Sequence, residues 1–134
     1  METVVLRIDT GSRPSVTDLT ERLIQFVRDR SDGLLSVFVP HATAGVAILE
    51  TGAGSDTDLV QHLERLFPRD DRWHHRHGSP GHGADHVIPA FVGPSVTVPV
   101  VNGAMTLGTW QSVCLVDPNG DNPTRDVRLS FLPA

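Results

Sequence analysis

The alternation of apolar and polar residues divides most of the chain into short β-strands. Residues 3–9 alternate with a period of two, and residues 127–131 do so again, which predicts two strands with one buried face each. Residues 34–39 carry apolar side chains on both faces, which is typical of a central strand. The short apolar run 45–49 predicts a further strand.

Two stretches have apolar residues at helical spacing instead. The first follows Ser15, a candidate helix cap paired with Asp18, and ends near Arg30. The second begins at Ser55, where the same capping pattern recurs, and Pro68 ends it. The pattern therefore predicts about two main helices.

The last third of the chain predicts a hairpin. Residues 95–101 are rich in β-branched side chains, the dipeptide 102–103 is Asn-Gly, and residues 104–116 form the returning strand. Pro99 lies within the first of these strands, which indicates an edge or a bulge.

Residues 69–86 break the pattern, because they are polar, contain several Gly and Pro residues, and show little periodicity. They predict a loop of a length that is usually functional or disordered. Together the segments predict one α+β domain over residues 1–134, with a mixed or antiparallel sheet of at least five strands and about two main helices.

Composition narrows the class of protein. A chain of 134 residues with 39% hydrophobic content fits a single globular domain. The net charge of -5 argues against a nucleic-acid partner. No apolar run is long enough to span a membrane, and the first residues lack the pattern of a signal peptide, so we expect a cytoplasmic protein without membrane association.

Histidine is concentrated in one part of the chain: all seven histidines lie between residues 41 and 86, and five lie within 74–86. Neutral imidazole is the commonest metal-ligating side chain, and zinc takes three or four such ligands. The cluster, completed by His41 or by an acid, is a candidate zinc site. The alternatives are a solvated polar loop and, for His41, a ring that only binds nearby backbone.

Other polar residues are candidates for binding or catalysis. Glu50 follows the third strand and can face the same cleft as His41 to orient it or act as a base. Thr43 opens a run of small residues whose backbone N–H groups can meet an anion. Gln111 is an amide that can contact a ligand, whereas Trp110 has burial in the core as its simpler interpretation.

Four motifs follow one another along the chain: FVPHATAGVAILE, Trp73-His74-His75, Ala84-Asp85-His86 and GPSVTVPVVNGAMTLGTWQSV. In this order they resemble the YjbQ-like family, whose members are often labelled secondary thiamine-phosphate synthase enzymes. Asp58 follows Glu50 where the family carries an acid, and His75 and His86 have the family's usual separation.

The resemblance implies a compact α+β fold and a homotrimer with sites near the subunit boundaries. It also selects three groups of site residues: His41, His75 and His86 as metal or anion ligands, Glu50 and Asp58 as neighbouring acids, and Trp110 and Gln111 as walls of the pocket. His82 stands where many relatives have Asn, and His77 stands where the loop varies.

Three hypotheses follow. The first is a metal-dependent enzyme that acts on a small molecule, with zinc on His41, His75 and His86 and with Glu50 or Asp58 as base. The family label adds a phosphorylated substrate and thiamine-phosphate synthase activity. The second is a non-catalytic trimeric module that binds a metabolite or a metal. The third is a structural trimer whose histidines lie at an interface.

Overall fold

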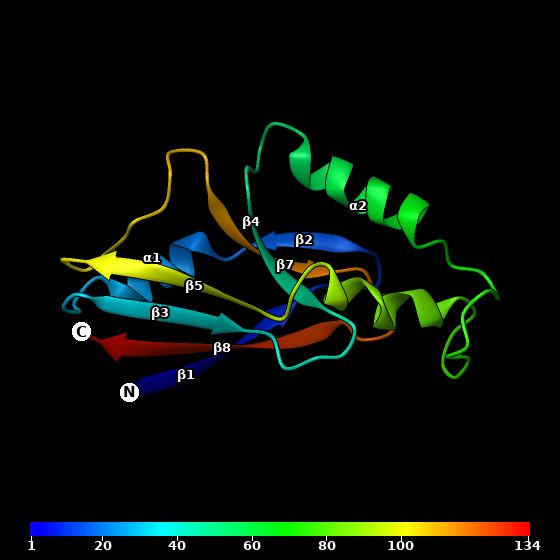
Figure 1. The fold of residues 1–134 in the computed structure, drawn as a ribbon, viewed down its shortest axis with the longest axis horizontal. Coiled ribbons are helices and arrows are strands. Elements are labelled where there is room, and N and C mark those ends of the chain that lie inside the picture. Colours follow the sequence, from blue (N-terminus) through cyan, green and yellow to red (C-terminus); the bar gives the residue numbers. More distant parts are fainter.

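Two antiparallel β-sheets form the framework of the computed structural model, which describes residues 1–134 (Figure 1). The larger sheet has the strand order β1-β8-β3-β5-β6 and the smaller has β2-β7-β4. The α+β prediction is confirmed, with two sheets in place of one. The strands are β1 (Glu2–Asp9), β2 (Ser15–Asp18), β3 (Gly33–Phe38), β4 (Gly45–Leu49), β5 (Ser95–Val101), β6 (Ala104–Met105), β7 (Ser112–Asp117) and β8 (Thr124–Pro133). The helices are α1 (Thr20–Val27), α2 (Ser55–Leu66) and the 3-10 helices η1 (His82–His86) and η2 (Ile88–Ala90).

The larger sheet confirms one detail of the pattern and corrects another, because the strand that holds Pro99 is next to the edge of the sheet and not at it. Strand β3 is central, because it pairs with β5 on one side and with β8 on the other. Pro99 lies on β5, and its carbonyl accepts a hydrogen bond from the backbone N–H of Thr106 at 2.9 Å, on the side of the short edge strand β6. Its missing N–H faces the same side, so the ladder between β5 and β3 loses no bond.

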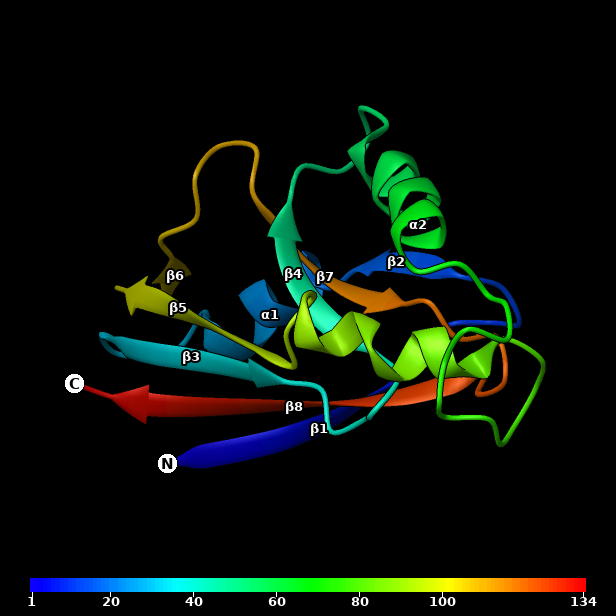
Figure 2. The ribbon, with the colours of Figure 1, turned by 45° about the vertical axis from the view of Figure 1, so that its right-hand side comes forward.

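The main core lies where α1 and the two sheets meet. Leu19 and the α1 residues Leu23 and Val27 are fully buried, and they join one apolar cluster with residues of both sheets such as Leu35 and Leu115. Helix α2 lies over the smaller sheet instead (Figure 2). No helix of the fold combines the length and the apolar character that a membrane crossing requires.

The predicted helix after Ser15 is wrong in its first turn. Residues Ser15–Asp18 form β2, which pairs with β7, and α1 begins only at Thr20. Val16 matches the helical spacing of the later apolar residues, but it packs in the second cluster with Leu63. A tertiary contact to another sheet therefore overrides the local pattern.

The capping prediction for the second helix is also wrong in detail. Helix α2 begins at Ser55, but its cap residue is Gly54, and no side chain caps it. The bond at this end comes from the backbone N–H of Asp58 to the carbonyl of Gly54 at 2.9 Å.

The predicted strand over residues 104–116 is interrupted. Strand β6 ends at Met105, and the chain leaves the sheet before β7 begins at Ser112. Gly108 and Gln111 close a turn, because the N–H of Gly108 donates to Oε1 of Gln111 at 2.8 Å and the N–H of Gln111 donates to the carbonyl of Gly108 at 3.0 Å. Trp110 at its tip is 73% exposed, so it is not a core residue.

Candidate metal centre

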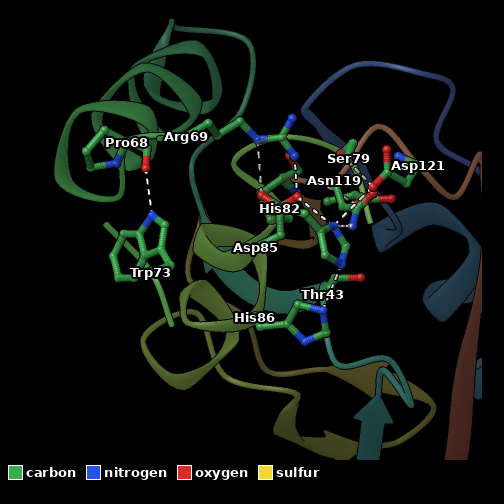
Figure 3. A network of polar contacts seen from close by, with 12 residues as sticks. Thr43, Pro68, Arg69, Trp73, Ser79, His82, Asp85, His86, Asn119 and Asp121 are labelled. Carbon is green, nitrogen blue, oxygen red and sulfur yellow. Dashed lines mark hydrogen bonds and ion pairs between the residues drawn. The ribbon is translucent and has the colours of Figure 1, made fainter. Parts of the chain in front are cut away.

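Three histidines converge beside η1, within the segment that the pattern predicts as one long loop. One ring nitrogen of each of His75, His82 and His86 lies within 4.8 Å of those of the others. The Nε2 atoms of His82 and His86 are 2.8 Å apart (Figure 3). The loop prediction holds for His75 but misses η1, which carries the other two rings.

Glycine allows the close approach that places His75 against η1. A Cβ atom on Gly83 would lie 2.5 Å from the carbonyl oxygen of His75 and 2.5 Å from Cβ of Trp73. Trp73 is itself fixed, because its Nε1 donates to the carbonyl of Pro68 at 2.8 Å. Arg69 forms an ion pair with the buried Asp85 of η1. These contacts hold the residues after α2 against the 3-10 helix.

Carboxylates orient the ring of His82. Its Nδ1 lies 3.0 Å from Oδ2 of Asp121 and 3.6 Å from Oδ2 of Asp85. Nδ2 of Asn119 lies 3.2 Å from the same nitrogen. Ionised carboxylates only accept hydrogen bonds and favour a proton on Nδ1, whereas the amide nitrogen of Asn119 only donates and favours the other tautomer. Hydrogen bonds to a charged group are the stronger ones, so we assign the proton to Nδ1. The lone pair of the neutral ring is then on Nε2, which faces His86.

The surroundings of His75 and His86 favour the neutral form of both rings. Burial and the neighbouring His77 and His82 lower the pKa of His75, and burial together with His75 and His82 lowers the pKa of His86. Nε2 of His75 is buried and has no hydrogen-bond partner. A buried polar atom without a partner costs about 1–3 kcal/mol. A metal ion bound to this nitrogen would remove that cost.

The donor set fits a divalent metal such as zinc. Zinc binds imidazole nitrogen at about 2.0–2.1 Å, and tetrahedral ligands at that length lie about 3.3 Å from one another. The Nε2 atoms of His82 and His86 are 2.8 Å apart, and one nitrogen of each of the three rings lies within 4.8 Å of the others, so small side-chain movements reach this spacing. The carboxylate on the far side of His82 is the usual outer partner of a ligating histidine.

A hollow opens beside two of the three histidines, His75 and His82. Its charged lining residues are Arg69, Asp70, Asp71 and Arg76. The guanidinium of Arg76 donates to two backbone carbonyls, at 3.2 Å and 3.1 Å, and makes no ion pair with a carboxylate. The hollow thus combines imidazoles with one cation, Arg76, and one anion, Asp71, that make no ion pair.

His41 is not one of the converging histidines. Its Nε2 accepts a hydrogen bond from the backbone N–H of Asp126 at 2.9 Å, as in the backbone-bound alternative. Thr43 is also engaged in the fold, because its Oγ1 accepts a hydrogen bond from Nη2 of the buried Arg125 at 2.9 Å. The sequence-predicted set of His41, His75 and His86 is therefore brought together only in part.

The remaining predicted residues lie away from the cluster. Glu50 follows β4, and Asp58 is in the first turn of α2, whereas the cluster follows the other end of that helix. The segment between β6 and β7, which includes Gln111, lies far from the segment that follows α2 in both ribbon views (Figures 1 and 2). Glu50, Asp58, Trp110 and Gln111 are all exposed.

Sequence reasoning missed His82 and the acids that orient it. The signal for His82 was its spacing of four residues from His86 within a Gly-rich stretch. Asp121 and Asn119 carried no signal, because they come from the turn after β7 and meet His82 only through the fold.

His41 predicts a dependence of stability on pH. Burial and the nearby Arg125 lower its pKa below the ordinary value of 6.5. The unfolded chain takes up a proton near 6.5 and the folded one only at lower pH, so stability falls as pH drops through this window. We expect a shallower fall for His41→Gln, which keeps an acceptor for the N–H of Asp126. Urea unfolding at about pH 7.5 and about pH 5, one above and one below the ordinary pKa of histidine, measures the two falls. Equal falls for both proteins would contradict the assignment.

The fold and the site define a class: α+β proteins of two antiparallel sheets with a histidine cluster beside a 3-10 helix. The family model described as "UPF0047 protein YjbQ-like" matches residues 4–134, and the chain belongs to this family. It is 64% identical over 132 residues to a UPF0047 protein of Mycobacterium tuberculosis, covering 98% of each chain. A UPF0047 protein of Archaeoglobus fulgidus is 32% identical over 121 residues, covering 90% of this chain and 94% of that one.

Solved structures share the fold. A hypothetical protein from Aeropyrum pernix K1 superposes with a TM-score of 0.89 at 32% identity, covering 100% of both chains. A YbjQ-like protein of unknown function from Sulfolobus solfataricus P2 gives a TM-score of 0.91 at 23% identity, covering 99% of this chain and 97% of that one. The second likeness concerns the fold alone.

Proposed function

We propose that this chain is a metal-dependent enzyme that acts on small anionic molecules, with a divalent ion, zinc by ligand type, held by His75, His82 and His86. The observation that carries the proposal is the convergence of three ring nitrogens, one of them buried without a partner. The ligand set replaces His41 of the sequence-based hypothesis with His82.

The chain's own residues supply most of the site. Asp121 holds His82 with Nε2 turned to the cluster, and the pair of Arg69 and Asp85 fixes η1. Arg76 provides positive charge at the hollow for a phosphate or carboxylate group of the substrate. When bound, the ion supplies Lewis acidity toward substrate oxygen. Thiamine-phosphate synthesis has less support, because two anionic reactants need more cationic groups than the hollow offers.

One observation favours the non-catalytic alternative. Both carboxylates near the histidines are already engaged: Asp85 with Arg69, and Asp121 with His82 and with the hydroxyl of Ser79, which donates at 2.8 Å. Asp71 lines the hollow without an ion pair, but its carboxylate contacts none of the histidines, so no carboxylate in contact with the metal ligands is left to act as a base. A metabolite screen with and without chelator separates the two functions: product formation that chelator abolishes supports the enzyme, and saturable binding without product supports the module.

Zinc titration of the metal-free protein tests the ligand set. We expect one ion per chain for the wild type and for His41→Ala, whose ring binds backbone away from the cluster. His86→Ala should lose this binding, because two remaining imidazoles do not make a zinc site. Circular dichroism checks that both variants fold. Loss of zinc in His41→Ala together with its retention in His86→Ala would overturn the assignment.

A further inference from the structure

A fourth imidazole stands against the three converging rings. The ring centre of His77 is 3.9 Å from that of His75, and it is 5.8 Å from each of the ring centres of His82 and His86. Among the three converging histidines, the ring centres are 3.9 Å, 4.6 Å and 5.7 Å apart. The four rings therefore form one cluster, although His77 is not one of the three proposed metal ligands.

The spacing of the four rings suits a single ion. With ligand nitrogens at about 2.0–2.1 Å and each ring centre about 1 Å further out, four tetrahedral imidazoles have ring centres about 5 Å apart. The six distances, from 3.9 to 5.8 Å, lie on both sides of this value. A small adjustment of side chains is enough to bring four nitrogens to one point.

The backbone fixes His77 beside the cluster but leaves its ring free to turn. A Cβ atom on Gly78, whose φ is +85°, would lie 2.9 Å from Cδ2 of His82, so the chain directly after His77 is pressed against a ligand ring. His77 itself is exposed, and its nitrogens are outside the group of three. Exposed side chains change rotamer within nanoseconds, so its ring can move in and out.

The hollow lies on the same side. It is lined by Gly78 and Arg76, the two chain neighbours of His77, and by His75 and His82. His77 is not itself part of the lining, but a molecule that enters the hollow meets His75, whose ring centre is 3.9 Å from that of His77. An anionic group attracted by Arg76 would arrive at the position that His77 can occupy.

We propose that His77 is an exchangeable fourth ligand, which closes the metal site when the hollow is empty and gives way to an anionic substrate group. This inference rests on the proposed function, and it describes the state of the metal site when no substrate is bound. Closed sites with four protein ligands are structural, whereas catalytic sites keep one position for water or substrate. His77 lets one cluster alternate between the two arrangements.

Cobalt-loaded protein tests the proposal without an activity assay, because both the ligands and their replacement are visible by spectroscopy. X-ray absorption counts the imidazoles bound to the metal. Titration with azide, followed by visible absorption, measures the affinity of the metal ion for an anionic ligand. His77→Ala removes the proposed ligand. His74→Ala is the matched control, since His74 is a neighbouring exposed histidine outside the ring cluster.

We expect four imidazoles for the wild type and His74→Ala, and the loss of one for His77→Ala. If His77 holds the position about nine-tenths of the time, azide should bind His77→Ala about tenfold more tightly than the wild type. Metal bound by three imidazoles in all proteins, with equal azide affinity, would overturn the role of His77 and leave the proposed function standing. Absence of metal binding by the wild type would overturn both.

Discussion

Replacement of Asp117 by alanine should destabilise the fold by about 3–5 kcal/mol, the usual result of leaving a buried charge without its partner. Asp117 is 0% exposed and Arg125 is 2% exposed. The carboxylate accepts hydrogen bonds from Nε and Nη2 of Arg125, at 2.8 Å and 3.0 Å, and from Oγ1 of Thr10 at 2.7 Å. It also accepts one from the backbone N–H of Asn119 at 3.0 Å. Urea unfolding measures the loss.

A surface ion pair is the matched control for Asp117→Ala. Nε of Arg7 lies 3.7 Å from Oδ1 of Asp126, with the two side chains 76% and 42% exposed. Arg7→Ala should change stability by less than about 1 kcal/mol. If Asp117→Ala does not fold, Asp117→Asn keeps the size of the side chain and should unfold at a lower urea concentration than the wild type. Stability of Asp117→Asn equal to that of the wild type would refute the prediction.

Asp121→Asn should weaken zinc binding by roughly 10–100-fold, the range found when an outer partner of a ligating histidine is lost. The carboxylate of Asp121, whose pKa is lowered mainly by its hydrogen bond from Ser79 and also by His82, favours the proton on Nδ1 of His82. An amide has no charge, so it holds the imidazole less firmly in this tautomer. Competition with a chromophoric chelator measures the affinity.

The control for Asp121→Asn is Asp71→Asn. Asp71 also lines the hollow and is exposed, but its carboxylate contacts none of the histidines in an ion pair. The Asp71→Asn variant should bind zinc as the wild type does. The comparison separates the effect of orienting His82 from the effect of losing one negative charge near the site. Equal affinities for both variants would show that Asp121 does not orient the ligand.

The sequence predicts the fold correctly for strands that bury only one face against the core. The alternation in residues 3–9 and 127–131 is the period of strands that are buried on one side, and these residues form β1 and β8. Val16 shows the limit of this reasoning. Its spacing from Leu19 and Leu23 suits a helix, yet its place is decided by β7, to which it pairs.

The site was predictable only as a region. The density of histidine after residue 74 pointed to the segment in which three histidines converge, and His75 and His86 are two of them. The third partner could not be identified from residue type, because His41 and His82 differ in what the fold places beside them. His41 meets a backbone N–H, whereas His82 meets two carboxylates and an open hollow.

The place of β8 in the larger sheet has a consequence for biosynthesis. This strand lies between β1 and β3, so each of them has a neighbour that the ribosome makes after everything else in the domain. Until then both strands expose unpaired backbone edges, which invite association with other nascent chains. Because β8 pairs with strands that are distant in the sequence, we expect the larger sheet to form slowly and late in folding. A chaperone that shields these edges during translation would raise the yield of folded protein.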